Sequence, residues 1–398
     1  MKKQLQINVL EAAKQRISWT FDTCKKIYVS FSGGKDSTVL LHLVIDEAIK
    51  RNIKVAVLFI DWEVQYNLTI EFVELCFNMY KDHIEPYWIC LPLLTTNSCS
   101  QFEPEWTCWD IDKKDLWVRD IHKLSIHDKN KFPFYYNSMT FEEFVIEFGK
   151  WYSNNELTAG LIGIRTQESL NRFRTINSEH KKCLENKKWT TVCTNNLIYA
   201  YPIYDWTAND DWIYFSKFKK QYNKIYDLMY YAGLTVNQMR ICEPYGYEQK
   251  KGLWLYHLLE PELWNKAVLR VNGANTGALY SNEPGIIMGN NKFNKPENHS
   301  WQSFAMLLLN TMPTKTSEHY KNKIAIWIKW YNKKNIEIQD ELPKDTGSKD
   351  MPSWRRICKV LLKNDYWCRN LNFSPTKMSN YENYIKSIQK KRELWNII

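Results

Sequence analysis

Six residues near the N-terminus combine types and spacing that suit the binding of an anion. The stretch Ser32-Gly33-Gly34-Lys35-Asp36-Ser37 supplies two hydroxyl groups, two glycines and one ammonium group. Glycine lets the backbone turn sharply and approach a ligand closely, and the first free N–H groups of a following helix would point at that ligand. Asp36 would oppose a phosphate unless it caps the helix or holds Mg²⁺. The stretch therefore predicts a site for a phosphate-type anion.

A strand and a helix are predicted to position this stretch. Residues 26–31 are apolar and rich in β-forming residues, which predicts a buried strand that contains Ser30. Residues 38–48 carry apolar residues at helical spacing, so a helix should follow the loop. A second buried strand is predicted at 54–60, directly before Asp61. Strand, helix and strand at this spacing indicate a parallel sheet, in which ligands bind at the carboxyl ends of the strands.

The stretch has the pattern S-G-G-x-D-S and not the Walker A pattern G-x-x-x-x-G-K-S/T. It resembles the PP-loop of the ATP pyrophosphatase superfamily. The resemblance implies an α/β fold with a parallel sheet flanked by helices, and cleavage of ATP between its α- and β-phosphates with Mg²⁺. Lys35 would then be catalytic and Asp36 a ligand of Mg²⁺; a Gly-Gly turn without a ligand is the alternative. The residues assigned to nucleotide binding are Ser30, Ser32, Gly33, Gly34, Lys35, Asp36, Ser37, Asp61 and Gly163.

A second polar group follows a predicted strand at 158–165. The pattern G-I-R-x-x-E-S-x-x-R, from Gly163 to Arg172, resembles the second signature of the phosphoadenosine phosphosulfate (PAPS) reductase branch. Two guanidinium groups seven residues apart could bind phosphate or sulfate through paired hydrogen bonds. Arg165 and Arg172 are therefore candidate catalytic residues. A surface arginine pair bound to carboxylates is the alternative interpretation.

Further strings extend the resemblance along the chain. The string at 201–210 is similar to the PAPS reductase branch and predicts a helix that begins after Thr207. Segments at 239–254, 270–277 and 353–359 look like the IbrA-like proteins, so the likeness covers nearly the whole chain. The segment at 270–277 is rich in Asn and Gly, and it is either a second anion-binding nest or a tight connection.

The ten cysteines of the chain do not form a recognised redox motif. PAPS reductases use a cysteine in an E-C-G-L-H setting, and neither Cys242 nor Cys368 has that setting. The intact S-G-G-K-D-S stretch without this cysteine favours ATP chemistry over reduction. His180, Cys183 and Cys193 form a weak metal-binding pattern, for which structural thiols are the favoured interpretation.

Length and composition bound the fold and the location. With 398 residues, 44% of them hydrophobic, the chain can form more than one domain. No apolar run is long enough to span a bilayer, and residues 1–6 lack a hydrophobic signal region. A cytoplasmic protein with reduced thiols is therefore expected. The predicted division is a PP-loop domain at 1–240 with an insertion at 92–133, a family-specific helical segment at 241–310 and a basic helical region at 311–398.

Most of the net charge of +10 lies in the last quarter of the chain, because residues 310–398 hold 18 Lys or Arg against 9 Asp or Glu. Cations interleaved with aromatic side chains suit stacking on the unpaired bases of nucleic acid, and Arg355 and Arg356 are predicted to contact its phosphates. A helical core with a solvated basic face is the alternative. The aromatic residues of this region are Trp327, Trp330, Tyr331, Trp354, Tyr366 and Trp367.

Together these patterns predict an enzyme that transfers the adenylyl group of ATP. An acceptor oxygen would attack the α-phosphate, pyrophosphate would leave, and the activated acceptor would take sulfur or nitrogen. A nucleic-acid base or a sulfur-containing metabolite is the favoured acceptor. Three alternatives stay open: a PAPS reductase or other sulfonucleotide-binding enzyme, a nucleotide-sensing regulator without turnover, and a nucleic-acid-binding subunit. A partner protein is also left open, no membrane partner is expected, and the oligomeric state is not predicted.

Overall fold

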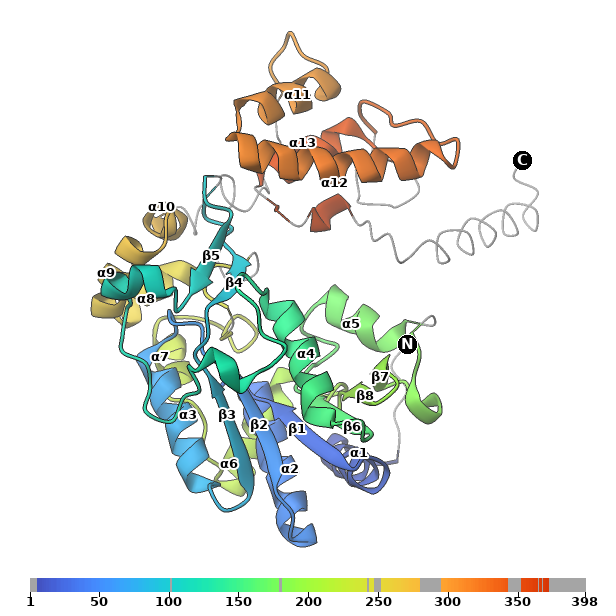
Figure 1. Cartoon of the computed structure of the whole chain (residues 1–398). Helices are drawn as coiled ribbons and strands as arrows, with labels where there is room; N and C mark the ends of the chain where they lie inside the picture. The colour runs from blue at the N-terminus through green and yellow to red at the C-terminus, as the bar shows by residue number, and fades with distance from the viewer. Residues whose placement is uncertain are drawn as a thin grey trace, which may run out of the picture. The chain divides into compact units, whose positions relative to one another are not determined.

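The N-terminal part of the chain builds a six-stranded sheet, in the order β3-β2-β1-β6-β8-β7, in the computed structural model of this protein (Figure 1). The strands are parallel except β7, which runs antiparallel to β8. All six residues of β2 are buried, as expected for a parallel sheet covered on both faces. The strands are β1 Lys26–Ser30, β2 Val55–Ile60, β3 Ile84–Ile89, β6 Thr158–Ile162, β7 Thr190–Thr194 and β8 Leu197–Ala200.

The chain divides into two compact units. The first comprises Met1–Thr95, Thr107–Pro244 and Leu255–Arg270, and the second comprises the remaining segments Thr96–Trp106, Tyr245–Trp254 and Val271–Ile398. The first unit therefore extends past the predicted boundary at residue 240. The structure describes residues 6–100, 102–178, 181–241, 243–246, 252–279, 295–342, 352–363, 365–366 and 368–371.

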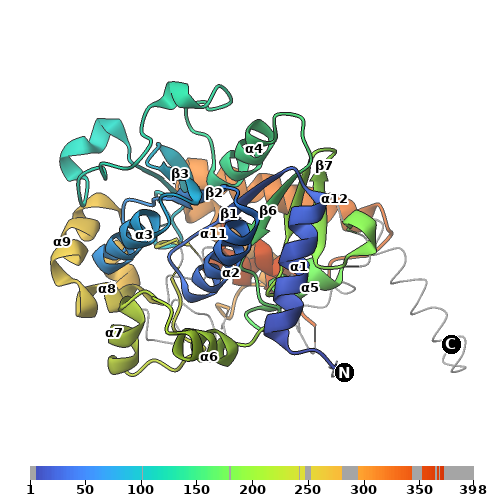
Figure 2. The same ribbon diagram turned by 90° about the horizontal axis from the view of Figure 1, so that it is seen from below.

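Helices cover both faces of the sheet. Figure 2 shows α1, α2 and α3 on one face and α4 on the other. Helix α2 directly follows the loop after β1, and its side chains Val39, Leu40, Leu43 and Val44 are buried. The sheet thus holds the N-terminus of α2 at the carboxyl end of β1. The helices of this part are α1 Val9–Thr23, α2 Lys35–Arg51, α3 Asn67–Met79, α4 Phe141–Ser153, α5 Leu170–Asn177, α6 Ala208–Phe218, α7 Ile225–Tyr231, α8 Leu253–Leu259 and α9 Pro261–Arg270.

The predicted insertion at 92–133 contains a two-stranded sheet of β4 (Leu93–Thr96) and β5 (Glu105–Cys108). Two 3₁₀ helices follow, η1 (Ile111–Leu116) and η2 (Lys129–Lys131). Trp109, which lies between β5 and η1, is buried, and its Nε1 donates to the backbone oxygen of Asp61 at 2.7 Å. This contact anchors the insertion at the carboxyl end of β2.

The predicted fold class is confirmed, since strand, loop, helix and strand follow one another as expected and the sheet is mostly parallel. The predicted N-cap at Thr207 is also found. Its hydroxyl accepts from the backbone of Asp210, whose carboxylate accepts from the backbone of Thr207, so α6 begins with a capping box. No pattern in the sequence predicts β7, which is a short edge strand of Thr, Val and Cys.

The second unit contains a helical core built by α11 (Trp301–Thr311), α12 (Thr314–Asn332) and α13 (Trp354–Leu362), and it also contains α10 (Ala274–Leu279). Trp327, Tyr331 and Trp354 are buried in this core, and Trp330 packs against it. Tyr366 is buried as well. For the four buried rings the prediction of stacking on nucleic-acid bases is therefore wrong, and the alternative of a helical core holds, because packing between helices occupies them. Trp330 is only partly buried. Trp367 lies outside the described residues, as does most of the helix predicted at 353–398.

Across the described segments, no helix has the length and apolarity that a membrane span requires.

Candidate active site

The loop between β1 and α2 is shaped by two glycines. Gly33 has a left-handed φ of 70°, and a Cβ atom there would lie 2.9 Å from Cγ2 of Thr69. A side chain is therefore excluded at this turn. Gly34 is the N-cap of α2, and no side-chain hydrogen bond caps this terminus. Asp36 consequently does not cap the helix, which was one of its two predicted roles.

Two serine hydroxyls hold the shape of the loop. Oγ of Ser37 accepts from the backbone N–H of Ser32 at 3.2 Å and donates to the carbonyl of Gly34 at 3.0 Å. Oγ of Ser32 lies 3.0 Å from Oγ of Ser37. These hydrogen bonds close the turn, and both hydroxyls stabilise the backbone that would surround an anion.

Lys35 is almost fully buried at the start of α2. Its Nζ donates to the carbonyl of Met239 at 3.0 Å and lies 3.8 Å from a carboxylate oxygen of Asp36. Its backbone N–H donates to Oη of Tyr226 at 2.9 Å. Segments from α7 and from residues after it thus lie against the loop, although they are about 200 residues away in the sequence.

Three ionisable groups, those of Asp36, Arg165 and Asp211, form a buried cluster behind the loop. Arg165 donates through Nε to Asp36, and the same Nε lies 3.4 Å from Oδ2 of Asp211 on α6. Burial raises the pKa of Asp36, but Lys35, a hydrogen bond with Asp211 and Arg165 outweigh it and bring this pKa to about 2. Burial and the nearby charge of Asp36 raise the pKa of Asp211 well above its usual value.

A proton on Asp211 accounts for this cluster. As a carboxylate, Asp211 would have two buried oxygens without a hydrogen-bond partner, which is costly in an interior. Asp36, which contacts the same guanidinium, is ionised and can only accept. A protonated Asp211 that donates to Asp36 satisfies both groups, and the Asp36 carboxylate then neutralises Arg165.

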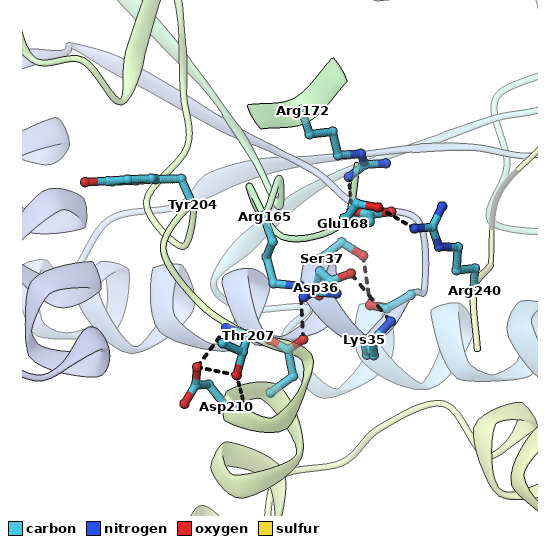
Figure 3. A network of polar contacts seen from close by, with 12 residues as sticks. Lys35, Asp36, Ser37, Arg165, Glu168, Arg172, Tyr204, Thr207, Asp210 and Arg240 are labelled. Atoms are coloured by element: carbon cyan, nitrogen blue, oxygen red, sulfur yellow. Dashed lines mark hydrogen bonds and ion pairs between the residues drawn. The ribbon is translucent and has the colours of Figure 1, made fainter. Parts of the chain in front are cut away.

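A hollow of about 70 Å³ opens beside the loop. This is smaller than the roughly 300–1,000 Å³ of pockets that enclose whole small ligands, so it suits one phosphate-type group. Figure 3 shows Arg172 and Arg240 on either side of Glu168, with Lys35 nearby. The residues that line the hollow are Ser32, Gly34, Lys35, Asp36, Ser37, Gly163, Glu168, Arg172, Tyr226, Arg240 and Ile241.

The arginines predicted from the sequence take different places. Arg172 lines the hollow, and its Nη1 lies 2.6 Å from Oε2 of Glu168. Arg165 does not line it, because its guanidinium is buried against Asp36 and Asp211. Gly163 lines the hollow, where an added Cβ would lie 3.0 Å from the backbone of Asp36 and Ser37. A glycine is thus needed for the end of β6 to approach the start of α2.

Ser30 and Asp61 are not among the residues that line the hollow. Ser30 is the last residue of β1. Asp61 is fully buried at the end of β2, where it accepts from Nε1 of Trp88 at 2.9 Å and pairs with Arg119. In this structure Asp61 fixes the insertion and the sheet to each other.

The first residue of the segment at 270–277 forms a buried ion pair in the first unit, which contains the six-stranded sheet and is called the sheet unit below. Arg270 donates to both carboxylate oxygens of Glu63, at 2.7 and 2.9 Å, and to the carbonyl of Thr107 at 2.7 Å. Later in the segment, Gly273 has a φ of 83°, and a Cβ there would lie 2.5 Å from the carbonyl of Cys99. Of the two interpretations, these contacts favour the tight connection over an anion-binding nest.

Four residues of the site were not predicted as site residues. Tyr226 lies far from the loop in the sequence and in no motif, and Asp211 follows the capping residue Asp210 directly. Glu168 lies inside the pattern around Arg165, and Arg240 lies inside the segment 239–254 that resembles the IbrA-like proteins, so both had a signal in the sequence.

The described cysteines do not offer a reactive thiol at the hollow. Burial raises the pKa of Cys24 and Cys193 to about 11 and that of Cys76, Cys358 and Cys368 to about 12. No group of three or more His, Cys, Asp or Glu suited to a metal ion occurs within the described ranges. His180 and Cys242 lie outside those ranges.

Two family matches cover different parts of the chain. Residues 26–88 match the phosphoadenosine phosphosulfate reductase domain, and residues 233–345 and 335–382 match a domain of unknown function, DUF3440. The uncharacterized protein YbdN of Escherichia coli (strain K12) is 49% identical over 400 residues, which cover 100% of this chain and 98% of YbdN. The chain belongs to the family of YbdN. Its sheet unit carries a PAPS reductase domain of the PP-loop superfamily.

More distant similarities accompany these. The uncharacterized protein MJ0066 of Methanocaldococcus jannaschii is 29% identical over 210 residues, which are 52% of this chain and 35% of MJ0066. A PAPS reductase from Candida auris, solved as a phosphate complex, is 13% identical with a TM-score of 0.31, over 57% of this chain and 94% of that one. An FMN adenylyltransferase from Candida glabrata is 18% identical with a TM-score of 0.32, over 55% of this chain and 57% of that one. The family membership rests on YbdN and on the match at 26–88.

Proposed function

We propose that this protein binds ATP at the loop Ser32–Ser37 and cleaves it between the α- and β-phosphates, transferring AMP to an acceptor. The observation that carries the proposal is the small cationic hollow at the N-terminus of α2, lined by Lys35, Arg172 and Arg240. Its size suits a phosphate group, and a helix N-terminus adds the dipole that favours negative charge.

The proposed reaction is a displacement at phosphorus. A lone pair of an acceptor oxygen forms a bond to the α-phosphorus, and the bond from that phosphorus to the bridging oxygen breaks, with its electrons leaving on pyrophosphate. Negative charge therefore develops on the leaving group, where Nζ of Lys35 and N–H groups of the first turn of α2 stabilise it. Arg172 is the predicted catalytic arginine that lines the hollow, and Arg165 acts by holding Asp36 and with it the loop.

Mg²⁺ would be held mainly by the nucleotide phosphates, with Asp36 as a protein ligand. The two carboxylates that line the hollow, Asp36 and Glu168, are each paired with a guanidinium, so the chain presents no preformed cage of carboxylates there. This fits the preference of Mg²⁺ for one or two carboxylates plus substrate phosphates. When bound, the ion would offset charge on the phosphates.

The acceptor that we favour is a nucleic-acid base or a sulfur-containing metabolite, and its activation would prepare it to take sulfur or nitrogen. The excess of cations in the last quarter of the chain supports a polyanionic acceptor.

Calorimetry and product analysis test the proposal together. The wild type should bind ATP with Mg²⁺, and AMP and pyrophosphate should form when total RNA and sulfur-containing metabolites are supplied as acceptors. Gly34→Asp adds a carboxylate at the hollow, and two charges 4 Å apart interact with about 4 kcal/mol at an effective dielectric constant of roughly 20. ATP affinity should therefore fall by at least about a hundredfold. Equal affinity in both proteins would refute the site, and binding without pyrophosphate release would favour a nucleotide sensor.

A PAPS reductase is the second candidate, because residues 26–88 match that domain and Cys242 follows the lining residue Ile241 in the sequence. None of the described cysteines lines the hollow, which argues for ATP chemistry instead. An assay with PAPS and thioredoxin separates the two candidate functions. Sulfite production that is lost on Cys242→Ser or Cys368→Ser would establish the reductase.

A further inference from the structure

Arg240 carries a charge that the described part of the structure does not neutralise. Its guanidinium is partly buried and donates through Nη2 to the backbone carbonyl of Glu168 at 2.6 Å. That is the one hydrogen bond found for it, and no carboxylate pairs with it, among the described residues. A guanidinium has five N–H donors in a rigid fork. A partly desolvated cation without a counter-ion is unfavourable, and an anion at its free edge would relieve this.

The other two cations at the hollow each lie within 4 Å of a carboxylate. Arg172 is paired with Glu168. Lys35 donates to the Met239 carbonyl and lies 3.8 Å from Asp36, a carboxylate that it shares with Arg165. Three cations and two carboxylates line the hollow, so its net charge is positive, and Arg240 is the cation without a paired carboxylate. An incoming anion should therefore meet Arg240 before it displaces any existing ion pair.

The backbone around Arg240 is held against the loop. The carbonyl of Met239 accepts from Nζ of Lys35 at 3.0 Å, and the carbonyl of Ile241 lies 4.0 Å from the position that a Cβ of Gly34 would take. Arg240 lies between these two residues in the chain. The hydrogen bond to Met239 therefore holds the segment that carries Arg240 beside the first turn of α2.

We propose that Arg240 binds the pyrophosphate end of the nucleotide and so completes the phosphate site. The inference rests on the proposed function. Arg240 lies in the region that matches DUF3440, which starts at residue 233, and not in the region that matches the PAPS reductase domain, 26–88. The phosphate site is therefore a composite of both matched regions. Inorganic pyrophosphate, with one of its phosphates in the hollow, brings more negative charge to these cations than AMP does, so it should depend more strongly on Arg240.

Calorimetry with inorganic pyrophosphate and with AMP, each with Mg²⁺, tests this assignment. Arg240→Gln keeps a donor for the Glu168 carbonyl but removes the charge, so pyrophosphate should bind about 10- to 100-fold more weakly, whereas AMP affinity should change less than about threefold. Arg240→Lys should restore part of the loss. The matched control is Arg174→Gln, an exposed arginine of α5 that does not line the hollow, and it should bind both ligands like the wild type.

Glu168→Gln supplies a second measurement with the opposite sign. Loss of this carboxylate removes a repulsive charge and frees Arg172, so pyrophosphate should bind several-fold more tightly. Unchanged or weaker binding would overturn the proposal, as would an Arg240→Gln variant that weakens both ligands equally or neither.

The two proposals fail in different ways. Wild-type protein that binds pyrophosphate through Arg240 but never releases it from ATP would contradict the proposed function alone. Release of pyrophosphate from ATP with unaltered affinity in Arg240→Gln would contradict the role of Arg240 alone.

Discussion

Two carboxyl groups, those of Asp36 and Asp211, share the guanidinium of Arg165 inside the sheet unit. Two carboxylates held against one guanidinium repel each other, so ionising both would cost much free energy, and one of the two acids keeps its proton. The ionised one is Asp36, which lies in the loop. Arg165 is thereby neutralised by the loop that it supports, and removal of either partner would leave a buried charge without compensation. This differs from the sequence-based expectation that Arg165 would face the phosphate.

The loop residues could be interpreted from the sequence, because the physical role of each depends only on its neighbours in the chain. The left-handed turn requires Gly33, and Lys35 follows from the need for a cation. The partners Tyr226, Asp211 and Arg240 could not be found in this way. Their role depends on the packing of α6, α7 and the following segment against the loop, which no local pattern encodes.

A buried histidine gives a pH-dependent prediction at the same scale. His42 in α2 is 1% exposed and lies 2.6 Å from Oη of Tyr80 and 3.0 Å from the carbonyl of Gln221. Burial lowers its pKa from 6.5 to about 4, although the Gln221 carbonyl raises it. The unfolded chain therefore takes up a proton at a higher pH than the folded protein. The resulting stability is present above pH 6.5 and is lost as the pH falls toward 4.

Wild-type protein should thus be less stable at pH 5 than at pH 7.5 by about 2 kcal/mol from this group. Urea unfolding at both pH values measures the difference. His42→Gln removes the titration while it keeps polar atoms at the site, so its stability should fall less over the same interval. A variant with the same pH dependence as the wild type would show that His42 is not responsible.

At the scale of elements, the site depends on how closely β6 approaches α2. The two elements are neighbours only because Gly163 has no side chain, since a Cβ would lie 3.0 Å from the backbone of Asp36 and Ser37. Gly163→Ala should push the start of α2 away from the end of β6. Stability should fall by about 1–3 kcal/mol, and ATP affinity should fall as the loop moves. Urea unfolding and calorimetry on one preparation measure both quantities.

Gly233→Ala is the matched control. Gly233 has a φ of 89° and no atom within 4 Å of its Cβ position, so the substitution adds backbone strain without a clash. It should lower stability by about 1 kcal/mol and leave ATP affinity unchanged. If both variants lose ATP affinity equally, general destabilisation and not the position of α2 is the cause.

The elements themselves were predictable where periodicity is strong. The apolar runs of β1 and β2 and the amphipathic face of α2 define the β-α-β unit without tertiary information. The edge strand β7 was not predictable, because four of its five side chains are partly exposed and the strand carries no apolar run. Its antiparallel pairing with β8 is set by the connection between them, which the sequence pattern does not specify.

At the scale of the whole molecule, several aromatic and arginine side chains of the last quarter lie in the interior of the second unit, although the composition suggested a binding surface. Of the described aromatic residues of the last quarter, Trp327, Tyr331 and Trp354 are buried in the core of the second unit, whereas several lysines of α12 are exposed. Arg356 is buried, and Arg355 pairs with Glu341 at 2.9 Å and lies 5.4 Å from the ring centre of Trp301. These two arginines therefore steady the helical packing, and the prediction that they contact phosphates is wrong for Arg356.

We expect nucleic acid to bind instead through exposed lysines in α12 and at the C-cap of this helix. Lys321, Lys329 and Lys333 are exposed there. Replacement of all three by Gln should weaken single-stranded nucleic-acid binding and reduce the magnitude of the slope of log affinity against log salt by about 2, because each neutralised phosphate contributes roughly 0.7. Mobility shifts over a series of salt concentrations measure this slope.

Arg355→Ala with Arg356→Ala is the control that separates surface charge from packing. It removes two positive charges, yet it should leave the salt slope unchanged and lower the melting temperature, because the Glu341 pair and a buried side chain are lost. The triple lysine variant should melt like the wild type, since its side chains lie in solvent. A reduced slope in the arginine variant, or no binding by the wild type at low salt, would contradict this assignment. The melting temperature and the salt slope together separate the two roles, because a packing defect lowers the melting temperature, whereas a lost phosphate contact reduces the salt slope.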